Sequence, residues 1–326
     1  MSQRNPKVVV IGGTYVDMAI RSGQSPSPGE SVMGSVLSYT TAGPGPIQAR
    51  QAALCGCQVH LIGKVGGDPF AQLISDSLAE FDVNTEFVSV AEAMNTGVIV
   101  TLVNAEGENA DCICCGANTA LLPQDISAAE RVICDADVCL IHGRLPQEVI
   151  ISALRCAELY GVKVILDPAR PLEPWPRAGE QRGRGTSNLP IEYFSADLLI
   201  PNLDEAADIA EQPAASIRSA KLIGSDLVAR GVRYAVITMG KRGCMVVGRD
   251  STDHVPAFEI EAVDNTGRGS AFAGALAAYL AVKRDIKGAV QFASAAGALA
   301  CTKFGAIEAL PSKAEIIELL QKTDIE

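Results

Sequence analysis

The sequence predicts an α/β fold, with a doubly wound, mostly parallel sheet flanked by helices and a small β-sheet lid. Three observations predict it: apolar β-branched runs alternate with helical patterns, a few segments alternate with period two, and 48% of the 326 residues are hydrophobic. A chain of this length and composition can bury a large core. We expect one α/β domain over residues 1–326, in which about residues 17–41 and 95–116 form the lid.

The parallel sheet is predicted from short apolar runs that end in turn residues. The run Lys7 to Gly12 is followed by Gly13, and helical patterns at 71–81 and 147–160 separate later runs of the same kind. Strands that alternate with helices in this way form parallel sheets. The expected strands lie at 7–12, 59–65, 136–141, 162–166, 197–200, 234–239, 244–247 and 254–258; Ala-rich helices and a last helix at 313–320 follow them.

The lid is predicted from alternating segments between turns. Residues 32–41 alternate, and 96–103 and 110–115 are the expected partners, joined by a turn at 104–109. Such segments suit an antiparallel sheet with one open face. The Pro- and Gly-rich stretch 172–190 has no such pattern, and we expect a surface insertion there.

Charge and hydropathy exclude several classes of protein. A formal net charge of −11 argues against general nucleic-acid binding, which needs basic surface. No apolar run reaches the roughly 18 residues that a membrane span requires. The first residues, Met1 to Pro6, do not resemble a signal peptide. We therefore expect a cytoplasmic protein without nucleic-acid or membrane partners.

The ten cysteines are expected to be reduced thiols. Several lie in apolar runs, where Cys packs as a small hydrophobic residue. Cys112, Cys114 and Cys115 form a cluster, but it lacks the paired spacing of a zinc site. Structural or incidental thiols are favoured over metal or redox use.

The stretch from Val263 to Leu276 is the main candidate for chemistry. Asp264 leads through small polar residues to Gly267 and Gly269, and an Ala-rich helical segment follows. Glycines allow a tight turn that aims N–H groups at one point, and a helix start adds partial positive charge. These features predict a phosphate or phosphoryl site. A turn capped onto a core helix would use the same residues.

Three other candidate sites have two interpretations each. Asp17 follows the first predicted strand, where open α/β sheets bind ligands, although a solvated or capping Asp would also fit. Asn202 and Glu205 stand at a strand-to-helix junction, where they would serve either a magnesium site or an N-capped helix. For His142 we favour a strand-end histidine bonded to backbone over a catalytic one.

These motifs resemble, in order and from Val8 to about Leu320, those of the ribokinase-like (PfkB) carbohydrate kinases. The family signature near the C-terminus is Asp-Thr-x-Gly-Ala-Gly-Asp, and Asp264, Gly267 and Gly269 match it. In the family the last Asp takes the proton from the attacking sugar hydroxyl, and Ser270 occupies that position here. The resemblance implies an anion hole at Gly267, Arg268 and Gly269, with Ser270 at the site of the base.

On the substrate side the resemblance is weaker. The family form Gly-Gly-x-Gly-x-Asn-x-Ala matches at Gly43 and Gly45, but Ala42 replaces the first Gly and Ile47 replaces the Asn that bonds the sugar. A sugar hydroxyl left unpaired in a closed pocket costs about 1–3 kcal/mol. Ribokinases usually carry Glu where this chain has Arg144. The implied substrate-binding positions are Asp17, Gly43, Gly45, Ile47 and Arg144.

On the nucleotide side the resemblance implies Mg-ATP as the phosphoryl donor and a monovalent cation such as K⁺. Glu205 and Asp264 are the implied metal positions. In the family the lid covers the sugar and often pairs with the lid of a second subunit, so a homodimer is expected. The implied nucleotide-binding residues are Asn202, Thr238, Gly240, Gly243, Gly305 and Ala306.

Two functions remain open, and a third class is disfavoured. The first is ATP-dependent phosphoryl transfer to a sugar or a related small alcohol, weakened by loss of the base. A general base typically contributes about 10²–10⁴-fold, and a Ser hydroxyl stays protonated at neutral pH. The second is a catalytically inactive relative that binds nucleotide or an anionic small ligand, which Arg144 and Arg268 would suit. An NAD-dependent oxidoreductase is disfavoured, because Gly12-Gly13 does not continue into the full dinucleotide fingerprint.

Overall fold

The fold is seen in a computed structural model that describes residues 5–105, 109–169 and 189–323. Its main sheet has nine strands in the order β13-β12-β11-β10-β9-β8-β1-β4-β5. Strands β5 through β11 in that order pair in parallel, and β12 and β13 are antiparallel at one edge. The strands are β1 Lys7–Ile11, β4 Gln58–Gly66, β5 Val83–Ala91, β8 Val138–His142, β9 Lys163–Asp167, β10 Leu198–Leu199, β11 Tyr234–Thr238, β12 Cys244–Gly248 and β13 Thr252–Val255.

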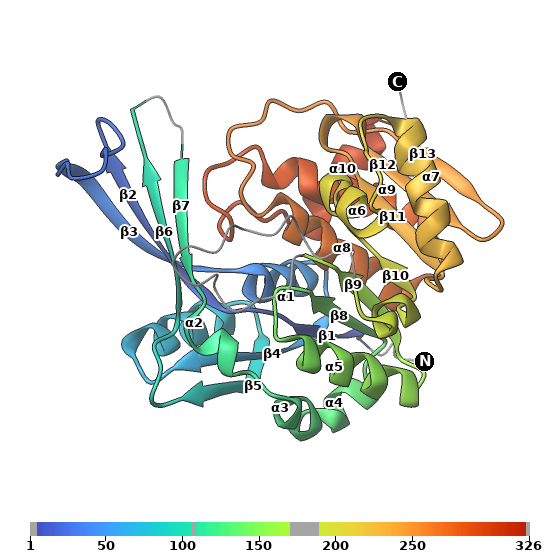
Figure 1. Ribbon diagram of the computed structural model, residues 1–326, viewed down its shortest axis with the longest axis horizontal. Coiled ribbons are helices and arrows are strands. Elements are labelled where there is room, and N and C mark those ends of the chain that lie inside the picture. Colours follow the sequence, from blue (N-terminus) through green and yellow to red (C-terminus); the bar gives the residue numbers. More distant parts are fainter. Residues whose placement is uncertain (1–4, 106–108, 170–188, 324–326) are drawn as a thin grey trace.

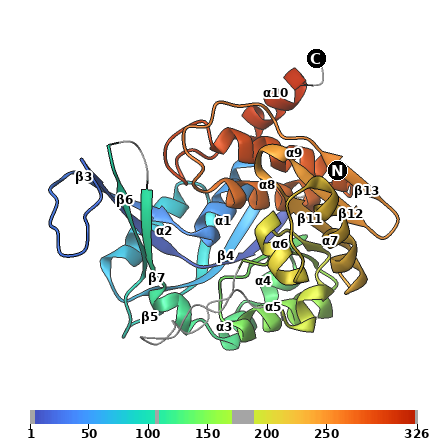
Figure 2. The ribbon, with the colours of Figure 1, turned by 45° about the horizontal axis from the view of Figure 1, so that its top comes forward.

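Helices cover both faces of this sheet, as the sequence predicts (Figures 1 and 2). In β1, Val8 and Val10 face one hydrophobic cluster, and Val9 and Ile11 face another, so each strand contributes to two cores. One face carries α1 Pro44–Leu54, α2 Pro69–Ala79, α8 Arg268–Val282, α9 Ile286–Ala300 and α10 Lys313–Thr323. The other carries α3 Pro123–Ala128, α4 Glu130–Cys134, α5 Gln147–Leu159, α6 Leu203–Ala210 and α7 Ile217–Ala229.

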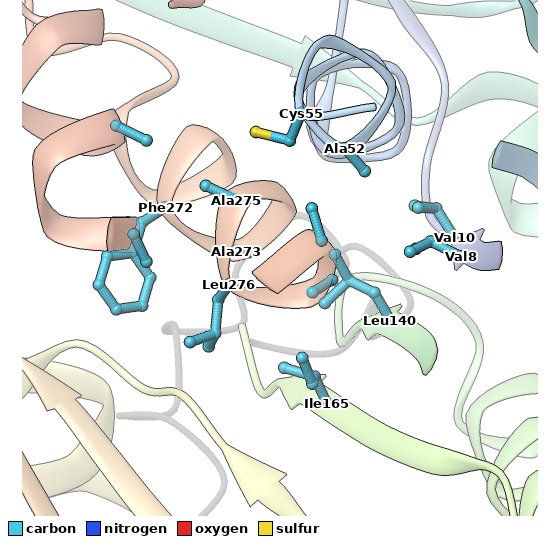
Figure 3. Packing of buried hydrophobic residues seen from close by; sticks show 14 of the residues in the cluster. Val8, Val10, Ala52, Cys55, Leu140, Ile165, Phe272, Ala273, Ala275 and Leu276 are labelled. Carbon is cyan, nitrogen blue, oxygen red and sulfur yellow. The ribbon is translucent and has the colours of Figure 1, made fainter. Parts of the chain in front are cut away.

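Helix α8 lies at the centre of the first core. Phe272, Ala273 and Leu276 of this helix belong to one buried cluster with Leu140 of β8 and Ile165 of β9 (Figure 3). A helix that is apolar on most of its surface must be buried, which explains the Ala-rich sequence after Gly269. The core therefore fixes the direction in which the first turn of α8 points.

A second, four-stranded sheet forms the lid and extends from the main body (Figure 1). Its strand order is β3-β2-β6-β7, with β2 and β6 parallel and the other pairs antiparallel. The strands are β2 Tyr15–Ser22, β3 Gly34–Ala42, β6 Gly97–Val103 and β7 Asn109–Cys114. The small separate sheet of the predicted fold class is confirmed, and β3, β6 and β7 fall at the segments 32–41, 96–103 and 110–115. The sequence analysis missed β2, and Asp17 lies inside this strand rather than in a loop after β1.

Several other boundaries differ from the prediction. Helix α1 begins at Pro44, inside the glycine motif that contains Gly43 and Gly45; Pro suits the first turn of a helix because it has no N–H to donate. The last strand ends at Val255, before Pro256. Strand β5 was not expected. The predicted surface insertion at 172–190 lies almost wholly outside the described residues.

The remaining predictions concern cysteines and membranes. All ten thiols are free, and four of them are buried: Cys55, Cys139, Cys244 and Cys301. In the described ranges no three His, Cys, Asp or Glu side chains are grouped to hold a metal ion. Among the helices of the described residues, none combines the length and apolarity needed to cross a bilayer.

Candidate functional site

A cleft of about 880 Å³ opens beside the first turn of α8, at the carboxyl ends of β8, β9 and β11. The chain runs outward from β1 to β4 and β5 and then returns to β8 on the other side of β1. Ligands of open α/β sheets bind at such a switch point, next to the carboxyl ends of the strands. Of the predicted site residues, the cleft is lined by Arg144, Asn202, Glu205, Thr238, Gly240, Gly243, Gly267, Arg268, Gly269 and Ser270.

The loop that enters α8 is shaped by Asp264. Its Oδ1 accepts hydrogen bonds from the backbone N–H and the hydroxyl of Thr266, at 2.9 and 2.6 Å, and its Oδ2 accepts from the N–H of Gly305 at 3.1 Å. Burial works against ionisation, but these hydrogen bonds outweigh it and hold the pKa of Asp264 below its usual value. Asp264 therefore joins the loop to the turn at Gly305. Both of its oxygens are engaged, so its predicted role as a metal ligand stays a prediction.

At the start of α8 the N–H of Arg268 donates one long hydrogen bond, to the Asn265 carbonyl at 3.4 Å. Gly267 is the N-cap at φ 78°, a left-handed conformation that favours glycine, and a Cβ there would lie 3.1 Å from Ala306. The first N–H groups of a helix have no partner within the helix. At Gly269 an added Cβ would meet no heavy atom within 4 Å. The arrangement has the parts of an anion site, and Ser270 belongs to the same first turn.

The nucleotide-side positions form a second set of turns. Gly240 and Gly243 follow β11 and have φ values of 59° and 80°. A Cβ at Gly243 would lie 2.0 Å from the carbonyl oxygen of Val255, so no other residue fits there without movement. The side chain of Arg268 reaches this loop, because its Nη2 is 3.7 Å from the Cβ position of Gly240. Arg268 thus faces the β11 side of the cleft.

Asn202 and Glu205 form a reciprocal capping box at the start of α6. Asn202 Oδ1 accepts from the N–H of Glu205, and Glu205 Oε2 accepts from the N–H of Asn202, both at 2.9 Å. This is the N-capped helix that the sequence analysis held open as the alternative. Both residues also line the cleft, so the capping role and a ligand role are compatible in space.

His142 is the last residue of β8 and is buried. Its Nδ1 accepts the backbone N–H of Arg144 at 3.2 Å, which confirms the interpretation as a strand-end histidine bonded to backbone. Burial, followed by the charge of Arg144, lowers the pKa of His142 to about 3, so the ring is neutral at physiological pH.

Asp167 is a buried carboxyl group that the sequence analysis did not select. It ends β9, its side chain is 16% exposed, and it lines the cleft. Its Oδ2 accepts from Gln48 Nε2 at 3.4 Å and lies 3.9 Å from His142 Nε2. Burial and then the charge of Glu205 raise the pKa of Asp167 to about 8, against the opposing effects of the Ala169 N–H and Arg144. Its place at the end of a predicted strand was the available signal.

The other substrate-side positions lie at the base of the lid and do not line the cleft. Asp17 is half-buried and accepts a hydrogen bond from the hydroxyl of Thr101 at 2.8 Å. Burial raises the pKa of Asp17; the Thr101 bond opposes this, and Asp111, Glu308 and Asp264 add to it.

The glycine motif of this region packs closely against other parts of the chain. A Cβ at Gly45 would come within 2.7 Å of the carbonyl oxygen of Gly12, and one at Gly43 within 2.5 Å of the Tyr15 ring. Ile47 is buried in a small apolar cluster with Ala271, Ala300, Ile307 and Leu310. The motif therefore holds α1 against β1 and α8, and its predicted contacts with substrate stay predictions.

The fold and the site define an α/β protein with a cleft beside the start of α8 and a separate β-sheet lid. The chain belongs to the pfkB family of carbohydrate kinases, which it matches over residues 5–313. It is 31% identical over 315 residues to a ribokinase of Bacillus subtilis, covering 96% of this chain and 99% of the relative. A deoxyribokinase of Salmonella typhi is 29% identical over 314 residues, covering 96% and 98%.

Solved structures agree with this fold. A ribokinase of Arabidopsis thaliana, complexed with ribose and ATP, superposes with a TM-score of 0.87 at 22% identity and covers 98% of this chain and 99% of its own. Other similar structures hold ADP, or ATP with Mg²⁺. The mostly parallel sheet with its separate lid is thus the ribokinase-like fold that the sequence predicts.

Proposed function

We propose that the protein transfers the terminal phosphoryl group of Mg-ATP to a hydroxyl of a sugar or a related small alcohol. The observation that carries the proposal is the cleft at the switch point of the sheet, where the open first turn of α8 faces carboxyl groups from β9 and α6. Phosphoryl transfer depends mainly on positioning and electrostatic stabilisation, which such a site supplies. Membership of a carbohydrate kinase family and relatives named ribokinase and deoxyribokinase support it.

In this proposal the start of α8 is the anion hole. The amide groups around Gly267, Arg268 and Gly269 stabilise negative charge on the transferred group, as preorganised donors do. The guanidinium of Arg268, directed to the loop after β11, adds a positive charge beside the phosphates. The nucleotide lies along Asn202, Thr238, Gly240, Gly243, Gly305 and Ala306.

The donor set suits Mg²⁺ delivered with the nucleotide. Mg²⁺ uses one or two carboxylates and takes its other ligands from waters and substrate phosphates. Glu205 lines the cleft and fits this demand better than Asp264, whose two oxygens already accept three hydrogen bonds. When bound, Mg²⁺ neutralises charge on the phosphates. A monovalent cation near Gly305 and Ala306 also belongs to the proposal.

The acceptor lies between the cleft and the lid. Asp17 would bond its hydroxyls, the backbone of Gly43 and Gly45 would approach it closely, and Arg144 would face it from the β8 side. Ile47 offers no hydrogen bond, which favours an acceptor that does not need one there. Lid pairing into a homodimer is supported by apolar side chains of β3, since Val36, Leu37 and Tyr39 are 55, 51 and 45% exposed.

Ser270 makes a second function worth testing, namely a nucleotide- or anion-binding protein without catalysis. The test is ADP release from Mg-ATP with a panel of sugars, nucleosides and sugar acids, using the natural protein and Ser270→Asp. Stimulation of the natural protein by one acceptor supports the kinase. If neither protein releases ADP while ATP still binds, the non-catalytic binding function would be favoured. Ser225→Asp, an exposed change on α7, controls for the added charge.

A further inference from the structure

We propose that Asp167 is the general base of this chain, which accepts the proton of the acceptor hydroxyl in place of the carboxylate that Ser270 lacks. The inference rests on the proposed kinase function. The sequence signature assigns no catalytic role to this position, and the inference comes from where the structure places the carboxyl group.

In the described part of the chain, three carboxyl groups line the cleft: those of Asp167, Glu205 and Glu259. Glu205 Oε2 is engaged in the capping box of α6, and Glu259 is an exposed residue of the loop after β13. Asp167 alone of the three stands at the end of a central parallel strand, beside the switch point of the sheet. It is therefore the carboxyl group best placed to meet a bound ligand.

Asp167 and Ser270 line the same cleft. Helix α1 contacts the elements that carry both residues. The carbonyl oxygen of Gln48 would be only 2.5 Å from a Cβ on Gly274, so α1 packs against α8 one helical turn after Ser270. The side chain of the same Gln48 donates to Asp167 Oδ2 at 3.4 Å. Gln48 thus joins Asp167 to the helix whose first turn holds Ser270.

The Asp167 carboxyl group is held by a buried side chain of α1. Gln48 is fully buried, and its Oε1 has no hydrogen-bond partner among the described residues. Its amide can donate to an ionised Asp167, and after a flip it can accept from a protonated one. The other groups around Asp167 are the neutral His142 ring, the Glu205 carboxyl group, the Arg144 guanidinium and the Ala169 N–H. A base must be supported in both protonation states during a catalytic cycle, and this surrounding provides for both.

The chemical step balances without a further reactant. The acceptor oxygen forms a bond to the γ-phosphorus, and the bond from that phosphorus to the β,γ-bridging oxygen breaks, with its electron pair leaving on ADP. The hydroxyl proton passes to the Asp167 carboxylate and then to solvent. The amide groups at the start of α8 hold the oxygens of the group in transfer.

The test compares kcat for four proteins: natural, Asp167→Asn, Ser270→Asp and the double variant. We expect Asp167→Asn to lower kcat by about 10²–10⁴-fold, the usual contribution of a base. Ser270→Asp should then restore at least a tenth of the natural kcat in the Asp167→Asn background, because it returns a carboxylate to the same acceptor oxygen. Asp250→Asn, an exposed change at the turn before β13, is the matched control. Thermal unfolding and binding of a fluorescent ATP analogue verify that each variant is folded.

Four results would overturn the inference, and they can be told apart. An unchanged kcat in Asp167→Asn would mean that its carboxylate takes no proton. A double variant that stays inactive while Ser270→Asp alone is active would give Asp167 a role other than base. A silent natural protein beside an active Ser270→Asp would keep the kinase site and remove its natural base. If no variant releases ADP with any acceptor, the proposed function fails and the base assignment fails with it.

Discussion

The two sides of the site are built from different parts of the chain. The proposed phosphate side consists mainly of backbone: the turn at Gly267, the first turn of α8 and the loop at Gly240 and Gly243. The proposed acceptor side consists mainly of side chains from the lid, α1 and the end of β8. Four departures from the family pattern, at Ala42, Ile47, Arg144 and Ser270, concern the acceptor and its proton, whereas Arg268 replaces an Ala on the phosphate side.

This difference has a physical reason. A site made of backbone N–H groups needs a particular chain path, and a change there disturbs the core that fixes α8. A site made of side chains can change one residue at a time while the path stays the same. We therefore expect phosphoryl handling and acceptor choice to be separable, and variants on each side test that separation.

The largest effect is expected at Gly267. Gly267→Ala puts a side chain at φ 78° and 3.1 Å from Ala306, which should distort the anion hole. We expect kcat for ADP release to fall by about 10²–10³-fold, as when an oxyanion donor is lost. Gly161→Ala is the control, since Gly161 also has positive φ, at 66°, with no atom near its Cβ position. Equal loss of activity in both variants would contradict the backbone account.

Ile47→Asn tests whether the acceptor side can be returned to the family pattern. Ile47 packs with Ala271, Ile307 and Leu310, so an unpaired amide there should lower the free energy of unfolding by about 2–5 kcal/mol. Ile47→Val should cost only about 0.5–1.5 kcal/mol. Urea unfolding measures both values. If Ile47→Asn were as stable as the natural protein, the side chain would face a polar pocket and not the apolar cluster.

Asp17→Asn tests the contribution of the lid to acceptor binding. The amide keeps the shape and the bond to Thr101 but loses the charge-assisted hydrogen bonds to acceptor hydroxyls. We expect KM for the acceptor to rise by about 5–100-fold, the equivalent of about 1–3 kcal/mol, with KM for ATP nearly unchanged. Steady-state kinetics with each substrate varied in turn give the two constants. A rise confined to KM for ATP would place Asp17 on the wrong side of the site.

The last prediction concerns the dependence of stability on pH. The pKa of Asp167 is raised to about 8 in the folded protein, so folding favours the protonated carboxyl. This contribution is complete at low pH and is lost as pH rises to about 8, by up to about 1.4 kcal/mol per pH unit. The free energy of unfolding of Asp167→Asn should lack this pH dependence. Between pH 5 and pH 8 the variant should therefore become more stable relative to the natural protein. Parallel melting curves in both proteins would show the Asp167 carboxyl ionised at both pH values.

The difference between backbone turns and side-chain contacts also explains which features the sequence could predict. The parallel sheet and the start of α8 were predicted, because buried strands such as Val8 to Ile11 and turns such as Gly267 leave local patterns. Strand β2 was missed because it starts just after a glycine turn and contains the polar residues Asp17 and Arg21. The Asp167 carboxyl group accepts a hydrogen bond from Gln48, which is 119 residues away along the chain. Such a long-range contact leaves no pattern in the local sequence.

The central claim is that the natural protein transfers a phosphoryl group to a hydroxyl although Ser270 stands at the position of the base. Phosphorus NMR of Mg-ATP with the best acceptor from the panel tests it directly, because it separates transfer from hydrolysis of ATP. We predict a new phosphate-ester signal that grows in step with ADP in the natural protein. ADP formed only with inorganic phosphate, or a phosphate ester formed only by Ser270→Asp, would contradict the claim.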